Sequence, residues 1–361
     1  MDTLGSKPVG STIKLKVNGV AKNFIIVHQG IPNTASSKPY DSSCDGTWLL
    51  MKDIYASQRW HGNTGTGSNS YANSSIHSYL NGTFLDLLDS DIKNAVKTVK
   101  IPYSAGGKGG KVYSGTSGLS TQIFLLSRVE VGYSNSPNAN IEGKVLGYFN
   151  GAENSDRIAY LSGTATRWWT RTPRTDYTHR TWFVDATGAD RDDYVTSSYG
   201  VRPALILPTT LFVDDSGYVV VNLAPTISGV DGNLGIFSTA KPTVSYTIND
   251  ENKDSVTATI KLNGTTKETK TVALGTAYTY TPSAADWAAL ALGSHTITIT
   301  ASDGKKSVTR TYTFVKEKPV LGTVTVGGMA KEYKDVYVNV GGAWKEAEKV
   351  YVMVNGVWKS V

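Results

Sequence analysis

Residues 168–203 combine side chains suited to ligand recognition with residues suited to a rigid scaffold. The stretch reads WWTRTPRTDYTHRTWFVDATGADRDDYVTSSYGVRP, so Tyr, Asp, Thr, His, Arg and Ser lie between Trp, Gly and Pro. Tyr and Arg bury large amphipathic area at modest entropic cost, and Ser, Thr and Asp supply adaptable hydrogen bonds. Lys, Glu, Gln and Met are absent although the stretch is strongly polar, which indicates a restricted codon set. The composition predicts a binding surface, with an ordinary polar loop as the alternative.

No side-chain pattern of a known catalytic centre occurs in the sequence. Phosphate-binding glycine loops, HExxH, paired CxxC, GxSxG and kinase-like sets are missing, and the five histidines lack metal-ligand spacing. Adjacent acids such as Asp192 and Asp193, or Asp214 and Asp215, point to opposite faces of an extended chain and make poor acid and base partners. The single cysteine, Cys44, forms neither an intramolecular disulfide nor a thiolate metal site alone. We expect no catalytic residues, no metal and no cofactor, hence a protein that is not an enzyme.

The composition describes a folded, strand-rich chain. Of the 361 residues 40% are apolar and 18% charged, and this length exceeds what one hydrophobic core usually serves. The net charge of +6 is spread along the chain without a basic block, which argues against nucleic acid as a partner. The sequence shows neither a secretory signal nor an apolar run long enough for a membrane span. We therefore expect synthesis in the cytoplasm without membrane insertion.

Three segments differ in pattern. Residues 1–222 mix strands and Gly-rich or Ser-rich loops with two short helices, which run from a cap at Ser74 or Ser75 to Leu80 and from a cap at Asp89 or Ser90 to Val96. Residues 223–318 place apolar side chains at every second position, as in VTATIKLNG and TITITASDG, and predict an antiparallel sandwich. Trp287 and Leu290 are expected to fill its core from a helical turn.

The third segment, residues 319–361, contains an internal repeat. VTVGGMAKE (324–332), VNVGGAWKE (338–346) and VMVNGVWKS (352–360) recur with a period of 14 residues. Each copy reads as strand, two-residue turn, strand, which is typical of a hairpin. Isolated hairpins are marginally stable. We expect these hairpins to serve oligomer contact or virion attachment, or to form a monomeric β cap.

Several phrases resemble a family of phage-encoded C-type lectin-like proteins, many of which are targets of diversity-generating retroelements. They are VHQG (27–30), YDSSCDGTWLLMKDIY (40–55), SIHSYLNGTFLDLLD (75–89), QIFLLSRVEVGY (122–133), RIAYLSGTATRWWTRTP (157–173) and SYGVRPALILP (198–208). The resemblance implies an α+β C-type lectin-like domain over residues 1–222. Residues 225–316 are similar to the immunoglobulin-like modules of tailed-phage structural proteins, so an all-β immunoglobulin-like sandwich and the β-hairpin repeats are expected to follow.

Retroelement diversification converts chosen codons to NNC, which never encodes Lys, Glu, Gln, Met or Trp. The resemblance therefore implies an exposed variable set that consists of Arg174, Asp176, Tyr177, His179, Arg180, Phe183, Asp185, Thr187, Asp190, Arg191, Asp193, Tyr194 and Thr196. It implies a fixed scaffold that includes Trp168, Trp169, Arg171, Trp182, Gly188, Gly200 and Arg202. Of these, the tryptophans are expected to pack inward, and Arg202 to hold a buried carboxylate or carbonyl.

Two departures limit what the resemblance implies. The Glu-Pro-Asn, Gln-Pro-Asp and Trp-Asn-Asp signatures of calcium-dependent sugar binding are absent, since the nearest phrase, SPNAN (136–140), lacks the acid. Formylglycine-generating enzymes share a related fold but need more cysteine chemistry than Cys44 provides. Calcium and enzymatic activity are thus unsupported.

The sequence as a whole favours a non-enzymatic phage receptor-binding protein or adhesin in a virion tail or fibre. Expected partners are a cell-surface protein or glycan, other virion proteins and further copies of the chain, because multiple copies allow weak sites to bind avidly. The alternatives are a bacterial lectin-like binding protein, diversified or not, and a formylglycine-type enzyme.

Overall fold

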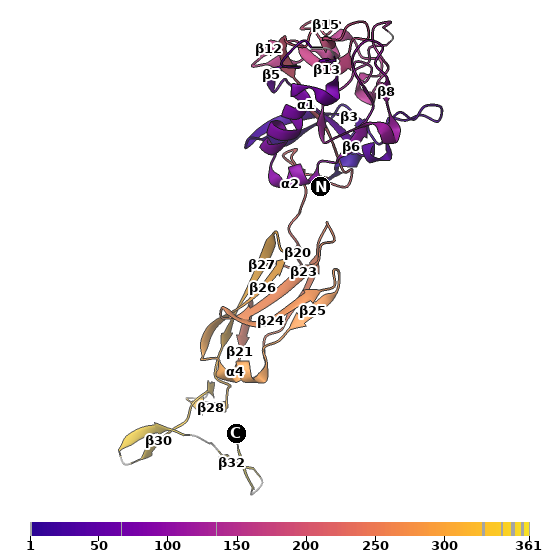
Figure 1. Ribbon diagram of the computed structural model, residues 1–361. Coiled ribbons are helices and arrows are strands. Elements are labelled where there is room, and N and C mark those ends of the chain that lie inside the picture. Colours follow the sequence, from indigo (N-terminus) through magenta and orange to yellow (C-terminus); the bar gives the residue numbers. More distant parts are fainter. Residues whose placement is uncertain are drawn as a thin grey trace. The chain divides into compact units, whose positions relative to one another are not determined.

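Two compact units, Met1–Val221 and Asn222–Val361, make up the computed structural model (Figure 1). It describes residues 2–65, 67–134, 136–326, 329–340, 342–347, 351–354 and 357–360. Strands take 43% of the chain and helices 13%, distributed over many small sheets. The expected fold class, an α+β lectin-like domain followed by an immunoglobulin-like sandwich, is therefore wrong. The strand content is that of an all-β fold.

The helices are real but too short to build a layer. Helix α1 (Ser75–Tyr79) begins where predicted, because the Ser74 hydroxyl accepts a hydrogen bond from the His77 amide at 3.1 Å. It passes directly into a π turn and a 3-10 turn, Leu80–Phe84 and Leu85–Leu87. Helices α2 and α3 span Ser90–Ala95 and Asn154–Arg157. Two or fewer turns bury little apolar area, so packing in this unit is left to sheets.

The core of the first unit lies against a five-stranded antiparallel sheet. Its order is β10 (Ile123–Phe124), β17 (Ala204–Leu207), β4 (Thr47–Met51), β3 (Val20–Gln29) and β2 (Thr12–Val17). Every residue of β4 and β17 is buried, as expected for central strands covered on both faces. The Trp48 ring packs edge-on against Phe124 with centroids 5.6 Å apart.

A second five-stranded sheet carries the stretch 168–203. Its order is β15 (Asp190–Tyr194), β14 (Arg180–Val184), β13 (Trp168–Pro173), β16 (Ser198–Val201) and β5 (Ala56–Arg59). All six residues of β13 are buried at the centre of this sheet. Smaller sheets pair β1 (Asp2–Thr3) with β18 (Phe212–Val213) and β19 (Val219–Val220), β6 (Val99–Ile101) with β9 (Leu119–Thr121), β7 (Tyr103–Ser104) with β8 (Val112–Tyr113), and β11 (Tyr160–Leu161) with β12 (Thr164–Ala165).

The second unit has its own apolar core between two sheets. One sheet has the order β20 (Thr226–Ile227), β22 (Val244–Asn249), β25 (Ala277–Tyr280), and the other β21 (Gly232–Phe237), β27 (Ser307–Lys316), β26 (Gly293–Ser302), β23 (Val256–Leu262), β24 (Thr265–Val272). Alternate residues of β23 and β26 are buried, which is the period-2 pattern of the sequence. From α4 (Ala284–Ala289), Trp287 stacks on Phe314 at 6.1 Å as the sequence predicted, and Leu290 packs against the same core.

The repeat segment forms three antiparallel strand pairs. They are β28 (Gly322–Val326) with β29 (Met329–Tyr333), β30 (Tyr337–Val340) with β31 (Ala343–Glu346), and β32 (Tyr351–Val354) with β33 (Val357–Ser360). Each copy of the 14-residue repeat falls on one pair. All eight residues of β30 and β31 are exposed.

Two glycine turns of the first unit provide a matched test of the scaffold. Asp185 and Asp214 each open a turn in which the carboxylate accepts two backbone amides, and each turn ends at a glycine, Gly188 with φ +83° and Gly217 with φ +85°. A Cβ on Gly188 would lie 1.8 Å from the Asn154 carbonyl oxygen, whereas a Cβ on Gly217 would meet nothing within 4 Å.

We expect Gly217→Ala to cost about 1 kcal/mol, which is the penalty of a left-handed backbone alone. Gly188→Ala adds a collision with backbone and is expected to cost at least about 2 kcal/mol more. Urea denaturation followed by tryptophan fluorescence measures both. Equal losses for the two variants would contradict the close approach at Gly188.

Candidate functional site

A buried ion pair anchors the central strand of the second sheet. Neither Arg171 nor Glu130 exposes its side chain, and Nη1 and Nη2 of the guanidinium each meet a different carboxylate oxygen at 2.6 Å. Arg171 also donates to the carbonyls of Pro102 and Leu125 at 3.0 and 2.9 Å. Burial opposes the charged guanidinium, but Glu130 outweighs it and raises the pKa of Arg171. Two parallel charge-assisted bonds fix β13 in both position and orientation.

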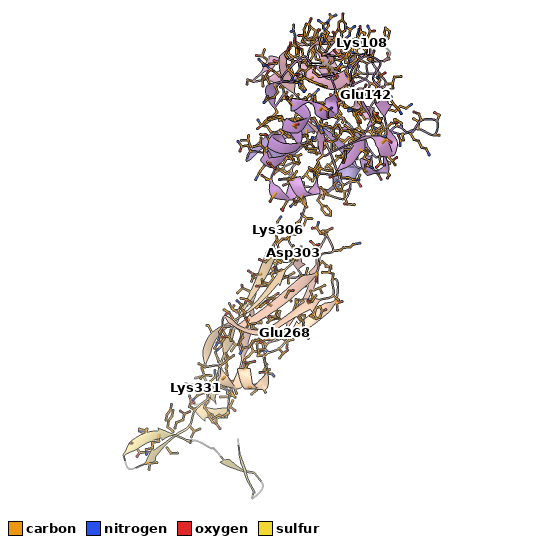
Figure 2. The ribbon with its side chains drawn as sticks, viewed as in Figure 1. Lys108, Glu142, Glu268, Asp303, Lys306 and Lys331 are labelled. Atoms are coloured by element: carbon orange, nitrogen blue, oxygen red, sulfur yellow. The ribbon has the colours of Figure 1, made fainter. Side chains whose placement is uncertain are left out.

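A second buried carboxyl belongs to Glu142, whose position in the first unit is labelled in Figure 2. Glu142 neighbours the pair, since its backbone carbonyl accepts from Nη2 of Arg171 at 3.3 Å. Its two oxygens accept from the Ser104 amide and the Thr172 hydroxyl, both at 2.5 Å. Burial raises the pKa of Glu142 to about 7 even though Arg171 acts in the opposite direction. The single positive charge of Arg171 can balance only one negative carboxylate. The cluster of Arg171, Glu130 and Glu142 is therefore neutral only when Glu142 holds its proton.

Other scaffold residues are held by backbone contacts. Trp168 and Trp169 are fully buried and donate from Nε1 to the carbonyls of Arg157 and Gln58 at 2.9 and 3.0 Å. Arg202 donates to the carbonyls of Met51 and Lys52 at 2.9 and 3.0 Å, so carbonyls and not a carboxylate hold it. Gly200 leaves no room for a side chain, because a Cβ there would lie 2.7 Å from Ile54.

The loop between β13 and β14 is clamped by the fully buried Asn69. Its Nδ2 donates to the carbonyls of Arg174, Tyr177 and Arg180 at 2.9–3.0 Å, and its Oδ1 accepts from the Gly107 amide at 2.8 Å. All three loop contacts involve backbone oxygens. The course of the loop is therefore fixed independently of the side chains at 174, 177 and 180.

Strands β14 and β15 and this loop present one mixed surface of arginine, aspartate and aromatic side chains. Cross-strand pairing sets Arg180 opposite Tyr194 and Trp182 opposite Asp192, so these four side chains share a face. We call this surface the Arg–Tyr patch, and it comprises Arg174, Asp176, Tyr177, Arg180, Trp182, Asp192 and Tyr194.

Ion pairs hold the charged members of the patch in place. Asp192 receives Nη1 of Arg174 at 2.6 Å on one oxygen and Nη1 of Arg180 at 2.7 Å on the other. Arg174 also forms a two-pronged pair with Asp176, at 2.8 and 2.6 Å. The Arg174 bond lowers the pKa of Asp176, which therefore stays charged near neutral pH.

The aromatic rings of the patch lie against these arginines. The Arg180 guanidinium is 4.6 Å from the ring centroid of Tyr194, and that of Arg174 is 5.0 Å from Tyr177. His179 stacks on Tyr194 with centroids 5.3 Å apart and planes within 6°. Tyr177 and Tyr194 still expose 42% and 44% of their area. Both rings are therefore held by neighbouring side chains while a large part of their area stays accessible.

The opposite face of β14 and β15 is structural. Phe183 is buried against Trp169 and Tyr199, and Asp193 accepts the Tyr199 and Ser197 hydroxyls at 2.5 and 3.0 Å. The expectation that Phe183 is exposed is wrong, because strand alternation turns it inward. Trp182 was expected to pack inward with the other scaffold tryptophans. It is instead half-buried on the patch face.

The remaining predicted residues lie outside the patch. Asp190 pairs with Arg128 at 2.5 Å, Asp185 and Thr187 belong to the turn before Gly188, Arg191 is exposed, and Thr196 is half-buried. Sequence reasoning missed Asp192, Arg128 and Asn69. Alternation along DRDDY would have found Asp192, because it puts 190, 192 and 194 on one face.

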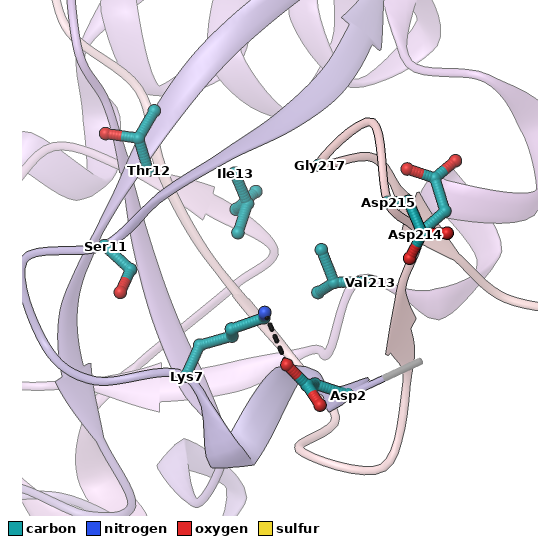
Figure 3. A pocket seen from close by; sticks show the side chains of 9 residues that line it. All are labelled: Asp2, Lys7, Ser11, Thr12, Ile13, Val213, Asp214, Asp215 and Gly217. Atoms are coloured by element: carbon teal, nitrogen blue, oxygen red, sulfur yellow. Dashed lines mark hydrogen bonds and ion pairs between the residues drawn. The ribbon is translucent and has the colours of Figure 1, made fainter.

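A polar pocket of about 520 Å³ lies elsewhere in the first unit, at the β18–β19 turn (Figure 3). Three of its charged side chains are engaged locally, since Lys7 pairs with Asp2 at 2.8 Å and Asp214 accepts the Ser216 and Tyr218 amides. Cys44 is buried, and burial raises the pKa of its thiol to about 12. Within the described ranges no three His, Cys, Asp or Glu side chains gather as metal ligands would. Over the same ranges no helix is long and apolar enough to traverse a bilayer.

We expect Asn69→Ala to loosen the loop at 174–180, because three carbonyls lose their shared donor at about 1 kcal/mol each. Hydrogen exchange of the amides in this loop should accelerate by tenfold or more. Asn150→Ala, which removes an exposed amide, is the control and should leave the loop unchanged. Unaltered exchange in Asn69→Ala would show that the clamp is dispensable.

Glu142 is expected to make the stability of the first unit depend on pH. Between its ordinary pKa of 4.5 and about 7, folded Glu142 holds a proton that the unfolded chain has released. The free energy of unfolding therefore falls as pH rises through this window, by on the order of 3 kcal/mol. Glu142→Gln should flatten this slope, and Asp91→Asn, at an exposed acid, should not. Urea denaturation between pH 4.5 and pH 8 measures the slopes, and identical slopes in wild type and Glu142→Gln would refute the assignment.

Comparisons with known proteins found a family match for only part of the chain. Residues 45–209, less than half of the sequence, match a family described as a domain of unknown function (DUF6273). A search of curated proteins found no match. Among solved structures, Drosophila N-cadherin EC1-3 is similar at 10% identity, with 60% of this chain and 61% of that chain covered and a TM-score of 0.19. Surface layer protein SbsC, domains 1–6, is 13% identical, with 86% and 36% covered and a TM-score of 0.18.

The chain thus spans less than two thirds of the length of either protein. What the comparisons establish is that residues 45–209, which include both the Arg–Tyr patch and the Arg171–Glu130 pair, resemble a family whose function is not described.

Proposed function

We propose that the chain is a non-enzymatic receptor-binding protein or adhesin of a virion tail or fibre, whose Arg–Tyr patch binds a protein or glycan on a cell surface. The observation that supports this most is the pair of half-exposed tyrosines, Tyr177 and Tyr194, each backed by a fixed arginine. Tyrosine and arginine are enriched among the residues that dominate binding energy at interfaces.

The ion pairs of the patch favour binding by ordering its side chains in advance. Arg174 and Arg180 are both held by Asp192, so less rotamer freedom remains to be lost when a ligand binds. Both rings present a flat face whose orientation is set by the guanidinium beneath. A patch arranged in this way resembles a matured antibody paratope more than a flexible polar loop.

The support beneath the patch also suits a surface whose side chains vary. Asn69 grips the loop through backbone carbonyls, and the Arg171–Glu130 pair lies wholly below it. Neither support depends on the residues at 174, 177 or 180. We therefore propose that these positions vary between sister sequences, as the resemblance to retroelement targets predicts, while Asn69, Glu130 and Arg171 do not.

The exposed hairpins could join several copies of the chain in one assembly. Two-stranded sheets are marginally stable alone, so β30 and β31 need a partner surface. We propose that the repeats attach the chain to other virion proteins or to further copies of itself. Several linked sites raise avidity by 10²–10⁴-fold over one site.

A matched pair of tyrosine variants tests the proposal. Tyr194→Ala, Tyr177→Ala and Arg180→Ala should each reduce binding to ligands found on a glycan and cell-surface protein array by tenfold or more, since hot-spot truncation costs about 2 kcal/mol. Tyr160→Ala is the control, because Tyr160 on β11 exposes 45% of its area, nearly the same as Tyr194. Its binding should equal wild type.

The proposal fails if the three patch variants bind the array ligands as wild type does. It also fails if Tyr160→Ala loses as much binding as Tyr194→Ala. Circular dichroism of each variant establishes that the fold is intact.

A further inference from the structure

A recess of about 230 Å³ opens next to the Arg–Tyr patch. Four of its lining residues are apolar, namely Val129, Pro137, Ala139 and Ile141. Ile141, one of these four, is 62% exposed, so its side chain is accessible to a ligand. Small-molecule sites occupy about 300–1,000 Å³, so the recess suits one side chain better than a cofactor.

The polar groups around the recess are directed elsewhere. Arg128 donates from Nε to Asp190 at 2.7 Å and from Nη1 to the Ser134 carbonyl at 2.6 Å. Asn140 donates from Nδ2 to the Ser104 hydroxyl and the Gly110 carbonyl at 2.9 and 2.5 Å. The N–H donors of Arg128 and Asn140 are therefore engaged, so a sugar would compete with these bonds for its acceptor oxygens, whereas an apolar side chain needs no donor from the recess.

The recess and the patch form one continuous surface. The Arg128 guanidinium, at the edge of the recess, lies 5.0 Å from the ring centroid of Trp182 in the patch. Its ion-pair partner Asp190 belongs to β15, two residues from Asp192. On the other side, Ala139 forms a β-bridge with Arg174. A ligand seated on the patch therefore reaches the recess without crossing other elements.

We infer that the recess receives an aliphatic or aromatic side chain of a protein ligand whose neighbouring polar residues lie on the Arg–Tyr patch. This inference rests on the proposed function and narrows its ligand to a protein. An anchor side chain in an apolar recess with a rim of ordered ion pairs is the usual arrangement of an interface hot spot.

The test uses the full chain with ¹³C-labelled Ile, Val and Ala methyl groups. It is titrated with N-acetyl-phenylalaninamide, which presents one apolar side chain, and separately with methyl α-D-mannopyranoside. The methyl signals of Val129, Ala139 and Ile141 should shift with the phenylalanine amide and stay in place with the sugar. Ile141→Ser should reduce the shift of Val129 and Ala139 at least threefold. Val230→Ser, which removes a 76% exposed side chain from the other unit, should leave it unchanged.

Three results would overturn the inference. They are methyl signals that stay fixed up to the solubility limit of the amide, an equal response to the sugar, and an Ile141→Ser shift equal to that of wild type. Ile141 is largely exposed, so its replacement leaves the fold intact.

The outcome is separable from that of the proposed function. If Tyr194→Ala abolishes array binding while the recess methyls stay silent, only the recess assignment fails. If the recess methyls respond while the patch variants bind normally, the patch assignment fails and the recess stands.

Discussion

The first unit depends on one interaction, the fully buried pair of Arg171 and Glu130. It joins the central strand of the patch-bearing sheet to the segment that begins at Leu125, and further bonds from Arg171 reach Pro102 and the Glu142 carbonyl. Breaking such a pair by removing one partner costs about 3–5 kcal/mol, because the other charge stays buried without compensation. Apolar side chains at both positions would carry no buried charge. They would lack the two parallel hydrogen bonds that fix the orientation of β13.

That constraint separates the residues that hold the fold from those of the Arg–Tyr patch, which we propose face a ligand. Within the sheet, Trp168, Trp169 and Arg171 of β13 are buried, and their polar atoms contact backbone carbonyls or Glu130. Above it, Asn69 secures the loop through carbonyl oxygens. The patch side chains contribute little to either support. This separation is what we propose allows the patch side chains to vary while the backbone beneath them keeps its course.

Local features of the sequence predicted local structure well. The Ser74 cap located a helix start, and alternation located β23 and β26. Arg202 was expected to hold a buried carboxylate or carbonyl, and the structure gives it two carbonyls. The fold class was wrong because it rested on the family resemblance. The two short helices predicted up to Leu80 and Val96 do form, but they build no helical layer in a chain that is mostly strand.

Residues defined by long-range contacts escaped prediction. Asn69 is 105 residues from Arg174, and Glu130 is 41 residues from Arg171, so no local pattern connects them. Phe183 was misassigned and Asp192 overlooked for a different reason. The predicted exposed set was chosen by residue type. Exposure is instead decided by which face of β14 or β15 a side chain occupies.

The central claim is that ligand binds at the Arg–Tyr patch, and a footprint measures this most directly. Hydrogen exchange of the full chain is compared with and without a ligand recovered from the array. If ligand binds at the patch, exchange slows at residues 174–180 and 190–194, and the second unit is unaffected. Protection confined to the second unit, or to the first unit away from these residues, would contradict it.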